Sequence, residues 1–484
     1  MTDQQTSKKN IVTIREIEKE VNLLQFFSFT QAHPKNFFLD SSLTNSSVGR
    51  YSFIGYDPFL TLLSKGREIV LQDRQGTVKR RGNPFDELRT LLDKFHVEEN
   101  HDTLPFTGGA VGYFGYDLCH FIEHLPTNTI DDIKFPEMYF SFYDIIVTLD
   151  HLEKRCYIIS VDFSPDTVKS TEKRVNHLTT LLTQASRIQE EPKIIEKTKR
   201  HKIISNFSKE EYLKTIDSIK QYICQGDIYQ VNLSQRFQTQ IDVPSHEIFR
   251  RLRNINPAPF SCYLKFDNKC VISSSPERFL SVRSESTRFD ENGQRVERKV
   301  QTKPIKGTRP RFDNSAMNEK MKSNLLSSKK DDSELTMIVD MERNDLGKVC
   351  SYNTVKVTAI KELEEHPTVY HLVGTVEGIL HPQNDVIDLI KATFPGGSIT
   401  GVPKVRAMQI IDELEPTRRN VYTGSIGYLS FNGNIDLNIA IRTFLVKDNH
   451  IFFQVGGGIV ADSHPEKEYE ETLHKARALI DTLK

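Results

Sequence analysis

Residues 435–460 read IDLNIAIRTFLVKDNHIFFQVGGGIV, and this stretch decides the expected fold. Apolar and polar side chains alternate along its first half, and a second apolar run follows the polar residues 447–450. Alternation with a period of two residues is typical of a β-strand, and a short polar connection joins two such strands into a hairpin. We therefore predict a long antiparallel hairpin with strands 435–446 and 451–460.

The two faces of the first predicted strand differ in polarity. One face carries Ile435, Leu437, Ile439 and Ile441, and the other carries Asp436, Asn438, Ala440 and Arg442. The second face is too polar for a core, and the partner strand leads into three glycines, 456–458, that allow close approach of a ligand. We expect this face to line a wet cavity in which Arg442 clamps a carboxylate. The alternatives are a solvent-exposed face and a glycine bulge.

Further hairpins and helices flank this stretch. Strands are expected at 67–72, 144–149, 156–161, 260–266 and 270–274, and helices at about 209–224, 315–328, 403–413 and 465–483. Ser208 and Glu211 form a capping box at the start of the first of these helices. Long hairpins mixed with helices predict a mainly antiparallel α+β fold, not a doubly wound sheet.

Composition excludes several classes of function. The 484 residues include 64 basic and 65 acidic side chains, so a net charge of −1 gives no electrostatic case for nucleic-acid binding. No apolar run approaches the roughly 18 residues that span a bilayer, and the polar start MTDQQTSKKN has no signal-peptide core. The six cysteines form neither a CxxC pair nor a zinc pattern. We expect a cytoplasmic protein with no membrane or nucleic-acid partner.

The clearest change of composition lies at residues 186–201, SRIQEEPKIIEKTKRH. This segment is charged and has little apolar periodicity, which is typical of a linker. It predicts an N-terminal region, 1–190, and a second region, 200–484.

Residues 394–404, FPGGSITGVPK, form a glycine-rich turn before a predicted helix. Such a turn can bind an anion through backbone N–H groups. A Walker A loop needs Lys directly after its last Gly, and Val402 stands there, so ATP binding is not supported. The alternative is an ordinary turn into a helix, with Thr400 or Gly401 as the cap and Pro403 at the first helical position.

The C-terminal helix carries Glu468, Glu471 and Lys475 on one stripe. Two carboxylates one turn apart can share a hard cation. The alternative is structural, because acidic residues suit the first turns of a helix and Glu471–Lys475 is an ordinary i,i+4 pair.

Isolated ionisable residues lie beside strand and turn signals. Glu277 precedes Phe279, and a carboxyl group beside an aromatic ring can have a raised pKa and act as an acid. Lys306 stands between Ile305 and Gly307, where partial desolvation favours a nucleophilic amine. Taken singly, each of these residues is better explained as a surface charge.

Together, these segments resemble the family of chorismate-utilising enzymes. The resemblance rests on PGGSITGVPKVRAMQIIDELEP, GSIGYLSFNGNIDLNIAIRTF, VGGGIVADS and EYEETLHKA, and upstream on GDIYQVNLSQRF, SSPERF, PIKGTRPR and MIVDMERNDLGKV. It covers residues 200–484 in order, and GRYSFIGYDP and GGAVGYFGYDL extend it into the N-terminal region. The second region is accordingly identified as a chorismate-binding catalytic domain.

The resemblance implies a large two-sheet, antiparallel-rich α+β body with helices outside and a magnesium-dependent site. By motif match, the Mg²⁺-binding carboxylates are Glu334, Glu468 and Glu471, and the enolpyruvyl carboxylate is held by Arg442, Tyr422, Gly456 and Gly458. Lys475 matches a lysine near the metal, Ser398 and His371 match residues over the ring, and Glu277 matches the general acid for the C4 hydroxyl.

Two positions select among the reactions of the family. Members of the family that add water to chorismate resemble one another in a Lys that activates the water, and this chain has Gln230 at that position. A carboxamide cannot deprotonate water, so ammonia is the expected nucleophile. Anthranilate-forming members carry PIAGT, whereas PIKGT, with Lys306, matches members that form 4-amino-4-deoxychorismate. The resemblance therefore implies amination of chorismate at C4, with anthranilate formation as the alternative.

The resemblance also implies partners. The chain has no GxCxG-type nucleophile turn, so a glutamine amidotransferase subunit is expected to supply ammonia within a heterodimer. A separate lyase is expected to convert the product into 4-aminobenzoate. The segment that binds feedback tryptophan in anthranilate-forming members, LLES, reads FLDS at 38–41, and its shorter acid leaves tryptophan inhibition open.

Overall fold

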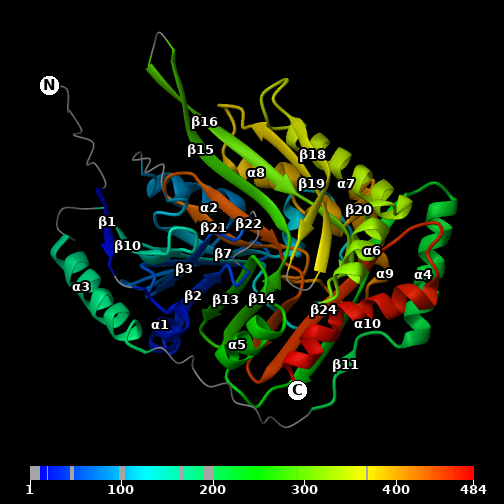
Figure 1. Cartoon of the computed structure of the whole chain (residues 1–484), viewed down its shortest axis with the longest axis horizontal. Helices are drawn as coiled ribbons and strands as arrows, with labels where there is room; N and C mark the ends of the chain where they lie inside the picture. The colour runs from blue at the N-terminus through cyan, green and yellow to red at the C-terminus, as the bar shows by residue number, and fades with distance from the viewer. Residues whose placement is uncertain are drawn as a thin grey trace.

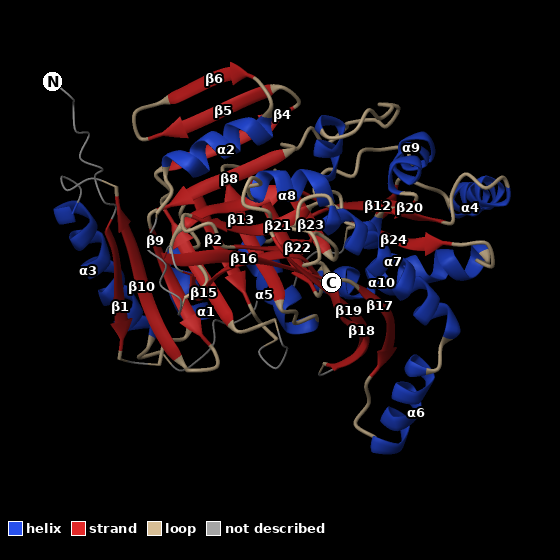
Figure 2. Cartoon of the chain, turned by 90° about the horizontal axis from the view of Figure 1, so that it is seen from above, coloured by secondary structure: helices blue, strands red, loops and turns tan. Residues whose placement is uncertain are grey.

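Two broad antiparallel sheets lie face to face in the computed structural model, and helices cover their outer faces (Figures 1 and 2). The structure describes residues 11–18, 20–43, 48–97, 104–163, 168–188, 201–290, 293–366 and 369–484, and the side chains of all of these except 285–290 and 293–296. Most of the predicted linker, at 189–200, lies outside this range.

The first sheet, sheet A, has twelve strands among the described residues. In spatial order it contains β1 (Ile11–Ile17), β10 (Arg155–Asp162), β9 (Ile145–Asp150), β3 (Tyr51–Tyr56), β2 (Lys35–Asp40), β13 (Phe260–Phe266), β14 (Lys269–Ser275), β23 (Thr443–Lys447), β24 (His450–Ile459), β12 (Gln230–Gln240) and β11 (Ile204–Ser205), and β20 (Gly401–Val402) also pairs with β12.

The second sheet, sheet B, is of the same size over the described part of the chain. Its order is β17 (Ile305–Pro310), β19 (Val369–Ile379), β16 (Gly293–Lys303), β15 (Arg278–Asp290), β22 (Ile435–Ile439), β21 (Ser425–Ser430), β7 (Gly109–Phe114), β8 (Met138–Tyr143), β4 (Leu60–Lys65), β5 (Glu68–Asp73) and β6 (Thr77–Arg81), and β18 (Lys356–Glu365) also pairs with β19.

Both sheets contain strands from both predicted regions. In sheet A, β2 pairs with β13, and in sheet B, β7 pairs with β21. Residues before 190 and after 200 therefore form continuous hydrogen-bonded sheets. The division into regions 1–190 and 200–484 stays a prediction about the sequence, and it does not correspond to a division of the sheets.

The central strands are buried on both faces, because one face meets the other sheet and the opposite face meets helices. In β2, Phe37 packs in the core between the sheets, and its neighbour Phe38 packs on the helix side. In sheet B, Tyr113 of β7 belongs to the core between the sheets, whereas Phe114 faces outward. Strands of this kind have near-continuous apolar sequences.

Ten α-helices and two short 3₁₀ helices are defined among the described residues. They are α1 (Leu23–Thr30), α2 (Pro84–Lys94), α3 (Val168–Ala185), α4 (Lys209–Cys224), α5 (Ser245–Ile255), α6 (Ser315–Leu326), α7 (Lys329–Gly347), α8 (Val386–Thr393), α9 (Lys404–Leu414), α10 (Pro465–Thr482), η1 (Tyr116–Phe121) and η3 (Gly397–Ile399). Helices α1, α3, α5 and α10 cover sheet A, and α2, α7 and α8 cover sheet B. The two-sheet α+β body with helices outside is confirmed.

Most of the local predictions are confirmed. The hairpins β9–β10 and β13–β14 form as expected, and β5 lies one residue later than the predicted strand 67–72. The capping box of α4 is present, since the Glu211 N–H donates to Ser208 Oγ and the Ser208 N–H donates to Glu211 Oε2. Helix α9 begins at Lys404, so Pro403 is the N-cap residue and not the first helical residue.

The predicted strand 435–446 is wrong as one continuous element. Residues Ile435–Ile439 form β22 in sheet B, and Thr443–Lys447 form β23 in sheet A, where β23 and β24 make the expected hairpin. Between them the Ile441 N–H donates to the Ile439 carbonyl, and Arg442 has a φ of 50°. The alternation of apolar and polar residues continues through this break, because residues of β22 before it and of β23 after it are both buried.

A buried ion pair joins several of these elements. Arg419 and Glu415 lie 2.7 Å apart, and each side chain is 1% exposed. Arg419 also donates to the carbonyls of Asn232 in β12 and Ile399 in η3. Glu415 accepts from the N–H and the hydroxyl of Ser234. The pair therefore holds β12, η3 and the turn before β21 together.

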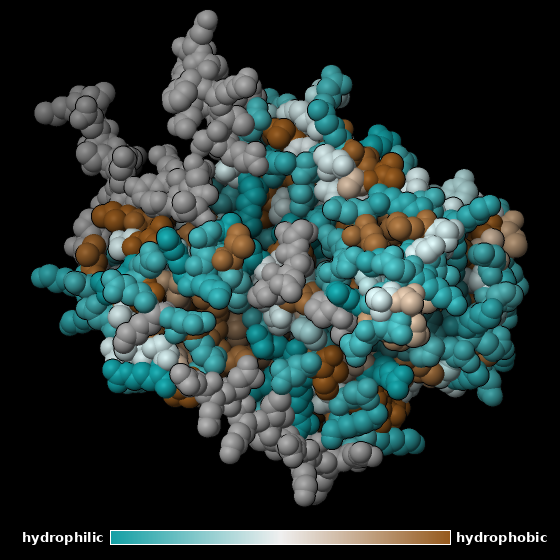
Figure 3. Space-filling view, viewed as in Figure 1, coloured by the Kyte–Doolittle hydropathy of each residue, from teal (hydrophilic) through white to brown (hydrophobic). Residues whose placement is uncertain are grey.

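The surface seen in Figure 3 is mainly hydrophilic, with hydrophobic side chains in separate small patches. Within the described ranges, none of the helices is both long enough and apolar enough to cross a membrane.

We predict that Arg419→Met lowers the free energy of unfolding by about 3–5 kcal/mol, because it leaves the Glu415 carboxylate buried without its counter-ion. Urea unfolding followed by circular dichroism measures this change. The control is Arg343→Met, because Arg343 and Asp340 form a surface pair with side chains 52% and 69% exposed, and its loss is worth about 1 kcal/mol or less. Equal effects of the two substitutions would contradict the structural role of Arg419.

Candidate active site

Glu277 lies in the tight connection between β14 and β15. The Ser275 hydroxyl donates to the Ile439 carbonyl over 2.6 Å, and the Ile439 N–H donates to the Glu277 carbonyl over 3.0 Å, so this turn is tied to the end of β22. The Glu277 side chain is 5% exposed and accepts a hydrogen bond of 2.6 Å from Ser398 Oγ. Burial raises the pKa of Glu277, and the hydrogen bond from Ser398 and the charge of Lys306 oppose this rise.

Lys306 projects from β17 toward the same serine. Its Nζ lies 3.3 Å from the Ser398 carbonyl, and no carboxylate in the described structure lies within ion-pair distance of it. Burial lowers the pKa of Lys306, although the charges of Glu334 and Glu277 act in the opposite direction. Gly307, with a φ of 78°, forms a bulge after Lys306, where a Cβ would lie 2.8 Å from Leu325 Cδ1.

His371 lies on β19 opposite Thr308, which follows the same bulge. Its Nδ1 is 2.9 Å from Thr308 Oγ1. Burial, with smaller contributions from His366 and Arg442, lowers the pKa of His371 to about 3. The imidazole is therefore neutral near pH 7, and it can exchange hydrogen bonds without contributing a positive charge.

Arg442, His371 and Lys475 line one cavity of about 320 Å³. Arg442 Nη1 donates to Asn256 Oδ1 over 3.3 Å, and within the described ranges no carboxylate forms an ion pair with this guanidinium. Burial lowers the pKa of Arg442, but a guanidinium keeps its charge at any ordinary pH. A half-buried cation without a carboxylate partner beside a cavity favours an anionic ligand.

The three predicted metal-binding carboxylates come from two facing helices. Glu334 is on α7, and Glu468 and Glu471 are on α10. A Cβ at Gly457 would lie 3.4 Å from Glu468 Oε2 and 3.8 Å from Glu471 Oε1, so both carboxylates point at this glycine. Burial raises the pKa of Glu334, and Lys306 and Lys330 oppose the rise.

This donor set fits Mg²⁺ in its chemistry, because Mg²⁺ prefers carboxylate oxygens and retained waters. A side chain at position 457 would contact the carboxylates of Glu468 and Glu471, so glycine leaves these two groups free of side-chain atoms on that side. A preassembled metal site is absent from the described part of the chain, where no three or more His, Cys, Asp or Glu side chains are grouped closely enough to hold an ion. The carboxylates would have to close around the cation.

The glycines of β24 lie between Lys475, Tyr422 and Gln230. Lys475 Nζ donates to the Gly456 carbonyl over 3.0 Å and pairs with Glu471 over 2.8 Å. A Cβ at Gly456 would lie 3.0 Å from the Tyr422 hydroxyl, and a Cβ at Gly458 would lie 2.6 Å from Gln230 Nε2. The Gln230 side chain is buried, and its Oε1 has no hydrogen-bond partner.

Sequence reasoning missed several residues of this region. Thr308, Asn256 and Lys330 contact predicted site residues, and Arg419 and Glu415 hold the elements that carry them. Thr308 had a local signal, because it belongs to the PIKGT motif. The Lys330–Glu334 and Arg419–Glu415 pairs have the i,i+4 spacing of ordinary helix-surface pairs, and the Arg442–Asn256 contact joins residues far apart in the sequence.

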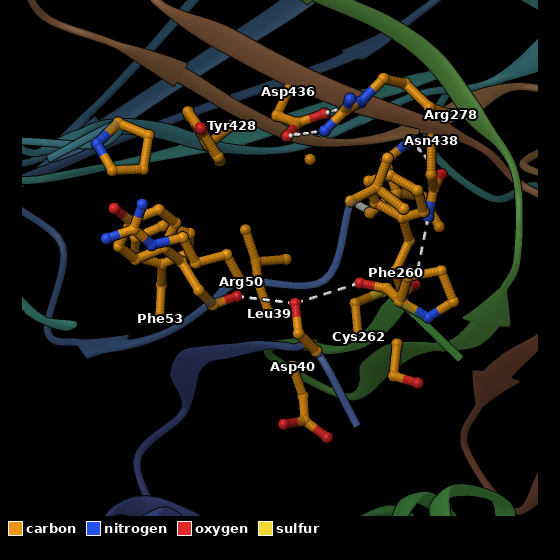
Figure 4. A pocket seen from close by; sticks show the side chains of 18 of the residues that line it. Leu39, Asp40, Arg50, Phe53, Phe260, Cys262, Arg278, Tyr428, Asp436 and Asn438 are labelled. Carbon is orange, nitrogen blue, oxygen red and sulfur yellow. Dashed lines mark hydrogen bonds and ion pairs between the residues drawn. The ribbon is translucent and has the colours of Figure 1, made fainter. Parts of the chain in front are cut away.

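A second cavity of about 170 Å³ lies between the sheets, apart from these residues. Asp436 and Asn438, on the polar face of β22, line this second cavity, whereas Arg442 lines the first. Figure 4 shows the Arg278–Asp436 ion pair on its wall and the Asp40 carboxylate pointing away. Asp40 accepts hydrogen bonds from Arg253 over 2.7 Å and Ser52 over 3.2 Å.

Comparison with known proteins identifies the family of this chain. Residues 38–481 match the family described as chorismate binding enzyme. Anthranilate synthase component 1 of Acetivibrio thermocellus is 38% identical over 455 residues, which cover 92% of this chain and 90% of that protein. Aminodeoxychorismate synthase component 1 of Klebsiella aerogenes is 37% identical over 459 residues, which cover 95% of this chain and 96% of that protein.

The solved structure of anthranilate synthase component I from Streptococcus pneumoniae has the same fold. It matches with a TM-score of 0.76 and 30% identity, over 90% of this chain and 93% of that one. Relatives with two different enzyme names occur at nearly equal identity, so identity alone does not select the product. The extent of these matches establishes that this chain is a chorismate-utilising enzyme and belongs to the chorismate binding enzyme family.

Proposed function

We propose that this protein aminates chorismate at C4, and that chorismate and ammonia give 4-amino-4-deoxychorismate and water. The observation that carries the proposal is Lys306, which is half-buried, contacts Ser398 as Glu277 does, and has a lowered pKa. A lower pKa increases the share of the amine that is unprotonated, and the unprotonated amine is the nucleophile. The described residues hold no carboxylate in ion-pair contact with it that would keep it charged.

The reaction divides into two displacements on the ring. The Lys306 amine adds at C2, the ring double bonds shift, and the C4 hydroxyl leaves as water with a proton from Glu277. Ammonia then adds at C4, the double bonds shift back, and the Lys306 amine is released from C2. The raised pKa of Glu277 favours the protonated form that the first displacement needs.

The substrate is a dianion, and the cavity offers cations to receive it. Arg442 and the Tyr422 hydroxyl would hold one carboxylate against Gly456 and Gly458. Glu334, Glu468 and Glu471 would hold Mg²⁺, which supplies neutralising charge for the ring carboxylate when it is bound. Lys475, His371 and Ser398 would border the ring from α10, β19 and η3.

The nucleophile is proposed to be ammonia. The partnerless Gln230 Oε1 is a hydrogen-bond acceptor that can receive an N–H but cannot deprotonate water. A glutamine amidotransferase subunit would supply the ammonia, which is consistent with relatives named component 1. A separate lyase would act on the product. The six free thiols suit a reducing, cytoplasmic setting.

Product identity tests the proposed function. The purified chain is incubated with chorismate, Mg²⁺ and ammonium, and an aminodeoxychorismate lyase is added to half of the sample. We expect 4-aminobenzoate in the half with lyase and none in the other half. Fluorescent anthranilate without lyase would instead place the protein among the anthranilate-forming enzymes.

We predict that Lys306→Ala lowers the rate of formation of the C4 amine by several orders of magnitude, because the first displacement loses its nucleophile. Mass spectrometry of chorismate reactions measures the rate. The control is Lys299→Ala, because Lys299 pairs with Glu377 away from the cavity and is half-exposed. An unchanged rate of C4 amination in Lys306→Ala would remove this lysine from the mechanism.

We predict that Ser398→Ala moves the alkaline limb of the pH profile of kcat/KM to higher pH. The Ser398 hydroxyl lowers the pKa of Glu277, so its removal raises that pKa and keeps the acid protonated at higher pH. The profile is measured at constant free ammonia.

The control for this profile is Ser425→Ala. Ser425 is a buried serine of β21 whose hydroxyl has no hydrogen-bond partner in the structure, so the profile should keep its shape. An alkaline limb of Ser398→Ala that stays in place or moves to lower pH would contradict the assigned contact.

A further inference from the structure

Lys330 occupies a position between the helices that carry the predicted metal-binding carboxylates. Its Nζ lies 3.8 Å from Glu334 Oε1 on its own helix, α7, and 3.9 Å from Glu468 Oε1 on α10. Among the described residues, it is the cation that forms an ion pair with both of these carboxylates.

The third carboxylate, Glu471, has a different partner, because Lys475 pairs with it over 2.8 Å and also donates to the Gly456 carbonyl. Lys306 donates to the Ser398 carbonyl. Lys330 is thus the cation placed between α7 and α10.

Helix formation does not explain this position. Lys330 is in the first turn of α7, directly after the N-cap residue Ser328 and Lys329. A cation at this end of a helix is opposed by the helix dipole. Its ammonium is held there by the carboxylates, and its side chain, which is 50% exposed and has a flexible stem, is free to turn outward.

We propose that Lys330 is a cation that Mg²⁺ must displace. Its ammonium holds Glu334 and Glu468 together in the enzyme without bound metal, and it turns into solvent when Mg²⁺ binds. Ligand distances of about 2.1 Å around Mg²⁺ leave no room for an ammonium between the same carboxylates. Lys330 thereby weakens the binding of Mg²⁺ and keeps the carboxylates assembled in its absence. This inference rests on the proposed magnesium site.

Metal binding tests the inference without any turnover. We titrate the full chain with Mn²⁺ in the absence of chorismate, follow free Mn²⁺ by electron paramagnetic resonance, and repeat the titration with Mg²⁺ in a calorimeter. Lys330→Met should lower the Kd about fivefold or more, since a unit charge at 4 Å is worth at least that factor even in a water-like medium. Lys330→Arg, which keeps the charge, should stay close to the unsubstituted protein.

The matched control is Lys329→Met, which removes the same charge from the neighbouring exposed position. A Kd that falls equally in Lys329→Met and Lys330→Met would overturn the proposal, because only general electrostatics would then act. An unchanged Kd in Lys330→Met would overturn it as well. If neither the unsubstituted protein nor any variant binds Mn²⁺ or Mg²⁺, the proposed magnesium site is wrong, and this inference is wrong with it.

Thermal unfolding gives an independent readout. In EDTA, Lys330→Met should unfold at a lower temperature than Lys329→Met, because its carboxylates repel one another without a counter-ion. Saturating Mg²⁺ should close this gap, since the metal then supplies the charge. A gap that persists unchanged in Mg²⁺ would show that Lys330 acts only as an ordinary surface ion pair.

Discussion

The ion pair between Arg419 and Glu415 is the interaction on which the arrangement of the site depends. Arg419 makes five hydrogen bonds, to Glu415 twice, to Thr423 and to the carbonyls of Asn232 and Ile399. Its guanidinium therefore fixes β12, the turn that contains Tyr422, and η3, in which Ser398 lies. Water is excluded from this region, so each of these groups must find its partner within the protein.

The site lies where the chain passes from one sheet to the other. β22 belongs to sheet B and β23 to sheet A, and Arg442 sits in the short connection between them. The Arg442 carbonyl accepts a hydrogen bond from the Ser274 N–H, and its side chain lines the cavity. The Arg442 and Lys306 charges remain without carboxylate partners in the described structure. A protein with a net charge of −1 can thus attract an anion through local cations alone.

Local patterns and motif resemblance predicted much of the fold and of the site. The capping box of α4, the hairpins around Asp150 and Asp267, and the antiparallel α+β class all follow from interactions within about twenty residues. The resemblance named Glu277, Lys306 and Ser398, and the structure brings these three into contact. The prediction of one continuous strand at 435–446 was wrong. β22 and β23 are both buried strands, so the residue pattern does not show where the chain leaves one sheet for the other.

The sequence by itself determined the class of fold, most helices and hairpins, and the family of the chain, because these depend on local periodicity and on motifs within short segments. Only the tertiary structure decided which charges are paired and which are not. Lys306, Arg442 and Lys330 look alike as isolated basic residues, yet the fold leaves the first two without an ion-pair partner in the described structure and places the third between two helices. The electrostatic environment of a side chain depends on groups from several segments of the chain that only the folded structure brings within a few ångströms.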